Sequence, residues 1–130
     1  MIIDTSVIIA ILRKEPESDI YSEAIAGASK TLIITPTYLE AAMVLASRTS
    51  EAAIQRLDAF LRQLGTKIIP YTEEMAIVAA RAFLTYGKDQ QHRAQLNFGD
   101  CMVYSASKVE AMPLLFKGED FGHTDVERVL

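Results

Sequence analysis

The sequence predicts an α/β fold in which a short, mainly parallel sheet is covered by helices on both faces. Short apolar or β-branched runs recur along the 130 residues, and stretches with helical spacing of apolar side chains separate them. Strands that alternate with helices in this way usually form a parallel sheet, because each helix returns the chain across the sheet. Half of the residues are apolar, so we expect a single domain over residues 1–130 with its own core.

The first half of the chain contains two expected strands, at residues 1–4 and 31–35. Both are short runs of apolar or β-branched residues, which favour buried strands. The neighbouring helices begin or end at residues that suit helix boundaries. These are Thr5 and Ser6 as caps before the apolar stretch 7–12, Gly27 near the end of helix 19–28, and Pro36 in the first turn of a helix that extends to about Arg48.

The second half continues the alternation. Ser50 is expected to cap a helix whose apolar residues follow helical spacing up to Leu64, and Gly65 is a good stop. Residues 67–70 form the third expected strand, and Thr72 starts the next helix with two acidic residues behind it. A polar loop at 87–95, a helix at 99–109, a strand at 114–116 and a short edge strand at 126–130 complete the expected order.

Four carboxylates stand next to apolar runs. They are Asp4 after residues 1–3, Glu40 just past residues 32–36, Asp100 at the start of the apolar stretch after residues 97–99, and Asp120 after residues 113–119. The carboxyl ends of parallel strands share one edge of a sheet, and ligands bind in the crevice there. Because four acids gathered at this edge repel one another unless a cation holds them, the pattern predicts a divalent metal site.

Taken singly, each acid also has an ordinary structural explanation. Asp4 and Asp100 stand where side chains cap helices. Glu40 fits a solvated acid in a first helical turn, and Asp120 beside Gly118 fits a loop residue. The joint pattern, with one acid after each of three expected strands and one opening a helix, favours a shared site.

Composition limits the function classes. The net charge of −4 argues against a broad basic surface, but the four acids account for all of it and leave 13 acidic residues against 13 Lys and Arg. The acidity therefore does not exclude a nucleic-acid substrate. With Cys101 as its only cysteine the chain forms no internal disulfide, which fits a reducing, cytoplasmic compartment. The apolar stretch 1–12 is too short to span a bilayer, so we expect no membrane role.

Clustered carboxylates suit Mg²⁺ or Mn²⁺, which prefer hard oxygen ligands. One or two such ions support phosphodiester hydrolysis, because they activate a water molecule and stabilise charge on the phosphate. In this hypothesis Asp4 and Asp100 are the core metal ligands, and Glu40 and Asp120 complete the site, bind a second ion or orient the attacking water. Thr5 or Ser6 and Lys117 are expected to contact the substrate or water. Lys88 and Arg93 in the 87–95 loop are also candidates for contact with a nucleic-acid backbone, although this segment equally fits an ordinary solvated loop.

Four segments resemble those of the PIN-domain ribonucleases, and most of all the VapC toxins of type II toxin–antitoxin systems. They are Ile3-Asp4-Thr5-Ser6, Glu40 in the helix after the second strand, Leu96-Asn97-Phe98-Gly99-Asp100-Cys101, and residues 114–121 with the sequence Leu-Leu-Phe-Lys-Gly-Glu-Asp-Phe. The motifs occur in the order typical of the family and span nearly the whole chain.

The resemblance implies a three-layer α/β/α sandwich and a Mg²⁺- or Mn²⁺-dependent endoribonuclease that cuts RNA, often tRNA or rRNA. It also implies a homodimer and a VapB-type antitoxin whose C-terminal segment blocks the acidic site. On the family pattern Asp4, Glu40, Asp100 and Asp120 form the acidic quartet, with Thr5 or Ser6 as the usual hydroxyl.

One position departs from the commonest family form, because Glu119 precedes Asp120 where a neutral residue is usual. Asp120 aligns better, and Glu119 is an alternative ligand. Two other function classes remain as alternatives. A Mg²⁺-binding receiver-type phosphoacceptor would need two adjacent acids after the first strand and a Lys-Pro pair, whereas this chain has only Asp4 there and Gly118 after Lys117. A catalytically silent PIN-like binding module would not need the intact quartet.

Overall fold

A computed structural model of the chain describes residues 1–46 and 51–130. Its centre is a sheet of parallel strands in the order β3-β2-β1-β4. The strands are β1 (Ile2–Ile3), β2 (Leu32–Ile34), β3 (Lys67–Ile69) and β4 (Leu114–Leu115). In the register, Ile2 of β1 lies beside Leu32 on one side and Leu114 on the other. The predicted parallel sheet is thus confirmed.

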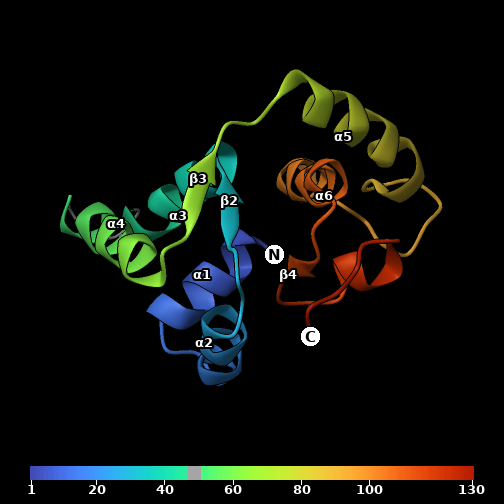
Figure 1. Cartoon of the computed structure of the whole chain (residues 1–130). Helices are drawn as coiled ribbons and strands as arrows, with labels where there is room; N and C mark the ends of the chain where they lie inside the picture. The colour runs from blue at the N-terminus through green and yellow to red at the C-terminus, as the bar shows by residue number, and fades with distance from the viewer. Residues whose placement is uncertain (47–50) are drawn as a thin grey trace.

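Helices cover both faces of the sheet, as Figure 1 shows. Alternate strand residues point to opposite faces: Ile2 and Leu32 belong to one core cluster, and Ile3 and Ile33 belong to the other. The first cluster is closed by α5 (Glu73–Tyr86) and α6 (Phe98–Glu110), and the second by α1 (Thr5–Leu12), α2 (Ser18–Ala26), α3 (Thr35–Ala46) and α4 (Ala52–Leu64). The result is the predicted three-layer α/β/α sandwich.

Several expected helix boundaries are confirmed. Gly65 ends α4 in the left-handed conformation, with φ of 66°, where a residue without a β-carbon is favoured. Thr72 caps α5, because its hydroxyl accepts a hydrogen bond from the Met75 N–H at 3.2 Å. The predicted end of the third helix at Arg48 and the predicted cap at Ser50 lie outside the described residues.

Other local predictions were wrong. Asp4 caps α1 in place of Thr5 or Ser6, which are already helical. Thr35 begins α3 and does not end β2. No edge strand forms at residues 126–130: Arg128 makes an isolated bridge with Leu114, so the pairing is limited to one residue. The predicted strand at 114–116 stops at residue 115, and the chain then turns into the short 3-10 helix η1 (Asp120–His123), which was not predicted.

None of the helices in the described part of the chain is long and apolar enough to cross a lipid bilayer.

Candidate active site

Asp4 lies at the carboxyl end of β1, where it caps the next helix. The Asp4 backbone N–H donates a hydrogen bond to the Leu115 carbonyl at 3.0 Å, which links Asp4 to the end of β4. Its Oδ2 accepts hydrogen bonds from the Ser6 N–H at 3.0 Å and from the Ser6 hydroxyl. The side chain is only 8% exposed. Burial, reinforced by the charge of Glu40, raises the pKa of this carboxyl above its ordinary value.

Glu40 projects from α3, the helix that follows β2. The Thr5 hydroxyl at the start of α1 donates to Glu40 Oε2 at 2.8 Å. A β-carbon on Gly99, in the first turn of α6, would lie 3.5 Å from the same Oε2. The carboxylate therefore lies between the N-termini of α1 and α6, although these helices are far apart in the sequence.

Asp100 occupies the first turn of α6 in a reciprocal capping arrangement with Asn97. The Asn97 N–H donates to Asp100 Oδ2, and the Asp100 N–H donates to Asn97 Oδ1, each at 2.9 Å. Burial raises the pKa of the Asp100 carboxyl to about 6, and the negative charges of Asp4, Asp120 and Glu40 add to the rise. The pKa of Asp100 is therefore raised first by burial and then by the charges of the other three acids of the predicted quartet.

Asp120 is the first residue of η1 and is exposed. The turn before it passes through Gly118, whose φ of 104° is a backbone conformation that favours glycine. The charge of Asp120 helps to raise the pKa of Asp100. The Glu119 carboxylate, by contrast, lies against Gly122, with Oε2 3.9 Å from the place where a β-carbon of that residue would stand. This geometry favours Asp120 over Glu119 as the fourth acid.

Lys117 connects the end of β4 to the loop between α1 and α2. Its Nζ lies 2.6 Å from Glu15 Oε2 and 3.0 Å from Glu17 Oε2, and its backbone N–H donates to the Ser6 hydroxyl at 3.0 Å. These hydrogen bonds raise the pKa of the Lys117 ammonium and lower that of the Glu17 carboxyl. The lysine that the sequence suggested for phosphate contact is therefore paired with two acids.

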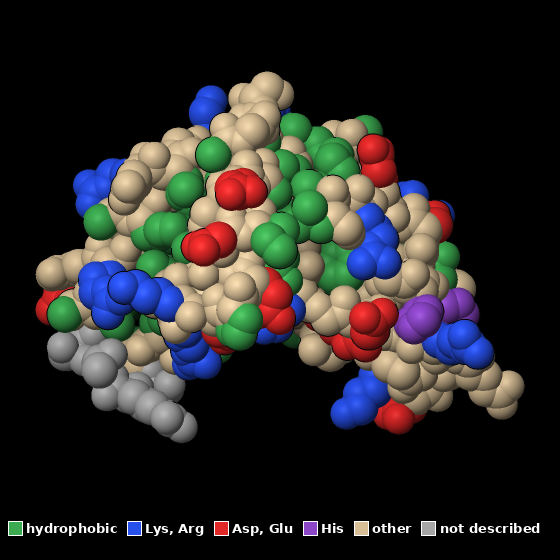
Figure 2. Space-filling view, turned by 90° about the horizontal axis from the view of Figure 1, so that it is seen from below, with side chains coloured by type: hydrophobic (Ala, Val, Ile, Leu, Met, Phe, Trp, Pro, Cys, Tyr) green, Lys and Arg blue, Asp and Glu red, His purple; other side chains and the backbone are tan. Residues whose placement is uncertain are grey.

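Asp4, Glu40, Asp100 and Lys117 share one open cavity of about 340 Å³, and Asp120 is not part of its lining. It is lined by Asp4, Thr5, Ser6, Ile9, Glu15, Glu40, Asp100 and Lys117. Predicted residues from four segments of the chain are thus brought together, whereas Lys88 and Arg93 do not line this cavity. On the face seen in Figure 2, Asp and Glu lie among hydrophobic side chains, and most Lys and Arg lie toward the sides.

Sequence reasoning assigned no role to Glu15 or Glu17, and it placed Asn97 in a motif without predicting its hydrogen bonds with Asp100. The spacing of Asn97 and Asp100, a polar cap residue followed three positions later by an acid, is a recognisable capping signal and could have identified the pair. The two glutamates carry no such signal, because a charged pair in a loop usually faces solvent.

The carboxylates fit a divalent cation in their chemistry, since all are hard oxygen donors. The charge of Glu40 also contributes to the raised pKa values of Asp4 and Asp100. As the side chains stand, no group of three or more acids, histidines or cysteines among residues 1–46 and 51–130 surrounds one point closely enough to hold an ion. Three of the four carboxylates instead accept a hydrogen bond from a protein donor: Asp4 from Ser6, Glu40 from Thr5 and Asp100 from Asn97.

Comparison with known proteins gives a consistent set of relatives. The family model described as "PIN domain" matches residues 1–127. Ribonuclease VapC30 of Mycobacterium tuberculosis is 40% identical over 129 residues, which are 99% of this chain and 98% of the relative. Ribonuclease VapC28 of the same species is 41% identical and the alignment covers 100% of this chain and 98% of the relative. Ribonuclease VapC of Mycolicibacterium smegmatis is 41% identical, with 99% of each chain covered.

Solved structures share the fold at lower identity. Mycobacterium tuberculosis VapC20, titled a Sarcin-Ricin loop cleaving toxin, superposes with a TM-score of 0.76 at 12% identity, covering 96% of this chain and 95% of that one. VapBC2 from Rickettsia felis, solved bound to a DNA fragment from its promoter, superposes with a TM-score of 0.75 at 16% identity. The superposition covers 98% of this chain and 94% of that one.

Proposed function

The chain belongs to the PIN-domain family and groups with the VapC ribonucleases, and from this premise we propose that it is a metal-dependent endoribonuclease and the toxin of a type II toxin–antitoxin pair. Residues 1–130 act as one PIN-like domain. The observation that carries the proposal is the cavity in which Asp4, Glu40 and Asp100 meet at the carboxyl edge of the sheet. Membership of this family excludes the receiver-type alternative, because receiver domains have a different fold and chemistry.

We assign the roles within the site as follows. Asp4 and Asp100 hold the ion directly or through water, and Glu40 and Asp120 complete its surroundings. Thr5 and Ser6 orient two of these acids, since their hydroxyls donate to Glu40 and Asp4. In the metal-free structure Asp4, Glu40 and Asp100 accept hydrogen bonds from protein donors. Binding of a cation would therefore move these carboxylates toward the ion or leave a water molecule between each carboxylate and the ion.

The chemistry needs a divalent cation, for which we propose Mg²⁺ or Mn²⁺, as one or two ions. When bound, such an ion lowers the pKa of a water molecule and stabilises charge on the phosphate oxygens and the leaving group. The chain itself contributes the carboxylates that concentrate negative charge at this point and the hydroxyls that fix their orientation. The N-termini of α1 and α6 also open at the site and offer positive dipole ends to phosphate oxygens.

The proposed partners follow from the family and from the exposed surface. The substrate is RNA, with tRNA or rRNA as the expected class, and the site of action is the cytoplasm. A VapB-type antitoxin is expected to block the acidic cavity. For a homodimer, Ile77 and Leu84 lie two turns apart on α5, are 49% and 72% exposed, and offer an apolar face. The sequence itself offers two apolar segments as an interface, 39–44 and 54–64. Leu39 and Met43 of the first are exposed, whereas the apolar residues of the second pack into the core.

The test is cleavage of labelled RNA by metal-loaded protein, compared with the same protein in EDTA. We expect cleavage with Mg²⁺ or Mn²⁺, none in EDTA, and a loss of at least 100-fold in Asp4→Asn and Asp100→Asn, since about 2.7 kcal/mol of transition-state stabilisation corresponds to that factor. Asp120→Asn and Glu119→Gln form a matched pair, of which only the first should lose activity. A folded, metal-loaded protein that cuts no RNA would overturn the proposal.

The toxin assignment has its own test. Expression of the wild type should arrest growth, expression of Asp100→Asn should not, and co-expression of a small protein encoded beside this one should restore growth. Normal growth during expression of active, soluble wild-type protein would contradict the toxin role while leaving the nuclease assignment intact.

A further inference from the structure

Phe98 is the most exposed large apolar side chain in the described part of the chain, at 82% of its surface. It is the first residue of α6, between the cap residue Asn97 and the Gly99 turn that adjoins Glu40. Exposed phenylalanine is costly in water unless something covers it. The ring precedes Asp100 by two residues and shares a hollow with Glu40, so it is a candidate contact for a ligand that enters the acidic cavity.

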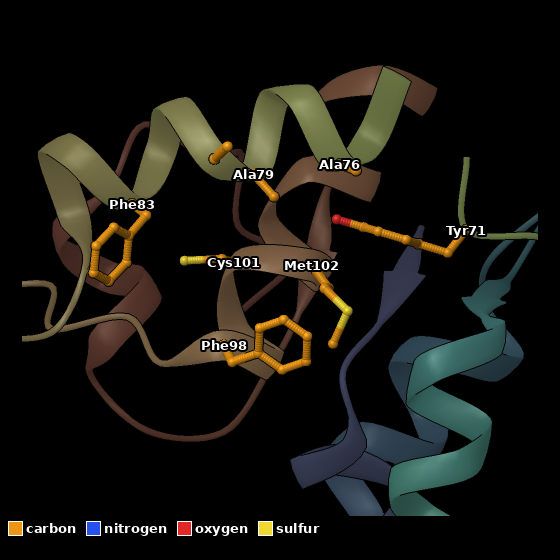
Figure 3. Close-up of a pocket in the computed structure, with 8 residues that line it drawn as sticks. Tyr71, Ala76, Ala79, Phe83, Phe98, Cys101 and Met102 are labelled. Atoms are coloured by element: carbon orange, nitrogen blue, oxygen red, sulfur yellow. The ribbon is translucent and has the colours of Figure 1, made fainter. Parts of the chain in front are cut away.

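Two apolar hollows lie on either side of this ring. Figure 3 shows the first, between α5 and α6, where Phe98 and Met102 face Phe83 and Tyr71 across a cavity of about 350 Å³. The second, of about 710 Å³, lies between α3 and α6. Its lining consists of Thr35, Pro36, Leu39, Glu40, Met43, Val44, Phe98, Gly99 and Met102.

The hollow between α3 and α6, named here the α3–α6 groove, adjoins the acidic cavity at Glu40. Glu40 lines both, whereas the α5–α6 hollow shares no lining residue with the acidic cavity. An RNA strand whose phosphate lies at the carboxylates can therefore place a neighbouring base in the α3–α6 groove, against Phe98.

We propose that the RNA base next to the cleaved phosphodiester bond leaves its stack and lies on the Phe98 ring in the α3–α6 groove. This inference rests on the ribonuclease function proposed above. The groove is walled by Leu39 and Met43, which are 59% and 64% exposed, and by the partly buried Met102. Flat apolar walls around an aromatic ring suit a nucleobase, because every base has a π-face and stacking does not require a particular sequence.

Charge supports the same occupant. The acidic cavity repels phosphate until a cation is bound, and Lys117, the lysine of its described lining, already pairs with Glu15 and Glu17. Because the lysine of this lining is already paired, stacking on Phe98 can supply binding free energy that a free lysine at the cavity would otherwise provide.

The substrate class follows from this geometry. A base can lie on a protein ring only if it is unpaired and turned out of the helix, so the enzyme should cut single-stranded segments or loops and spare duplex RNA. A duplex of the same sequence should therefore be cut much more slowly.

The test combines a protein change with a substrate change. An oligoribonucleotide that the wild type cuts is prepared with single abasic sites at each position around the cut. For the wild type we expect one position beside the cut where loss of the base lowers kcat/KM by about 5- to 150-fold, the range of one base–aromatic stack. Phe98→Leu should lower kcat/KM on the intact RNA by a similar factor and show no further penalty at that abasic site. Phe98→Tyr should retain both the activity and the penalty.

Two matched variants separate this effect from general loss of apolar surface. Phe83→Leu alters only the α5–α6 hollow, and Ile20→Ala removes an apolar side chain from α2 that is 56% exposed and lines neither hollow. Both should keep the wild-type penalty at the abasic site. Circular dichroism and sedimentation of each variant monitor folding and assembly.

The outcomes are distinct. If the wild type cuts RNA but Phe98→Leu keeps the full abasic penalty, the stacking role is wrong while the nuclease function stands. If Phe98→Leu changes only the sedimentation coefficient or only the affinity for an antitoxin peptide, the groove is an interface with a second copy or with that peptide, and the inference is overturned. If the wild type cuts no RNA, the proposed function fails and the inference falls with it.

Discussion

Replacing Asp100 by asparagine should stabilise the metal-free protein at neutral and alkaline pH while it removes the nuclease activity. The Asp100 carboxyl is partly buried among other acids, and its pKa is raised to about 6. Asparagine keeps an oxygen that can accept the hydrogen bond from the Asn97 N–H, so the capping arrangement at the start of α6 survives. The substitution therefore removes a charge and leaves the local geometry.

The magnitude follows from the pKa shift. A carboxyl whose pKa is higher in the folded protein binds its proton more tightly there, so its ionisation costs stability as the pH rises from its ordinary pKa of 3.8 through about 6. A shift of about 2 units corresponds to about 3 kcal/mol, and screening by solvent at this partly exposed position reduces it to about 1–3 kcal/mol. The gain of Asp100→Asn should be complete above pH 7 and vanish below about pH 4.

The assay is urea unfolding in EDTA at pH 4 and pH 8, followed by circular dichroism. At pH 8 the unfolding free energy of Asp100→Asn should exceed that of the wild type by about 1–3 kcal/mol. Adding Mg²⁺ should stabilise the wild type more than the variant, because a ligand present at 100 times its Kd adds about 2.7 kcal/mol only to a protein that binds it.

Asp125→Asn is a control of opposite sign. The hydrogen bond from the Tyr104 hydroxyl, with a further one from Lys108, lowers the pKa of the Asp125 carboxyl. The ionised Asp125 carboxylate therefore stabilises the folded protein at pH values above its ordinary pKa. This stability is lost as the pH falls through the lowered pKa of the folded state. Asp125→Asn should accordingly be slightly less stable than the wild type at pH 8. If Asp100→Asn is no more stable than the wild type at pH 8, or if its gain is equal at pH 4, the electrostatic account of the acidic cluster is refuted.

Three further predictions concern single side chains. Ala111 ends α6 with φ of 51°, so Ala111→Gly should raise the unfolding free energy by about 0.5–1 kcal/mol in thermal or urea unfolding, and a loss would contradict the left-handed cap. The buried Thr37 hydroxyl has no hydrogen-bond partner among the described residues, so Thr37→Val should be neutral or stabilise by about 1 kcal/mol, and a clear destabilisation would reveal a missed partner. Lys117→Gln should free the α1–α2 loop and speed trypsin cleavage at the exposed Arg13 and Lys14, whereas an unchanged cleavage rate would show that the ion pairs do not hold the loop.

The sequence was sufficient for the layers of the fold, because β1, β2 and β4 carry buried apolar residues on both faces. Ile2 and Ile3 are both buried, one in each core cluster, and a run of this kind predicts a strand covered on both sides. It was less reliable where short polar residues compete for one cap. Asp4, Thr5 and Ser6 are all good cap residues. The hydrogen bond from the Asp4 N–H to the Leu115 carbonyl of β4 keeps Asp4 outside the helix and so makes it the cap.

The candidate site was predictable in its residues but not in its contacts. The positions of Asp4, Glu40 and Asp100 follow from strand ends and helix starts, which local patterns predict. The pairing of Lys117 with Glu15 joins residues about a hundred positions apart, and no local pattern carries that information. The choice between Glu119 and Asp120 likewise depends on the turn at Gly118 and on η1, which sequence reasoning did not predict.

The structural and functional explanations of these acids are complementary. Asp4 caps α1 and Asp100 closes the capping box of α6, so each makes the hydrogen bond that a purely structural residue would make. Those caps start both helices at the carboxyl edge of the sheet, and the positive ends of the two helix dipoles then face the carboxylates. Burial is the main cause of the raised pKa of Asp100, and repulsion by the other acids adds to it. The helix dipoles offset part of that repulsion and so help the metal-free chain to fold with its acids gathered. The capping role is thus the means by which a repulsive cluster is assembled before any cation binds.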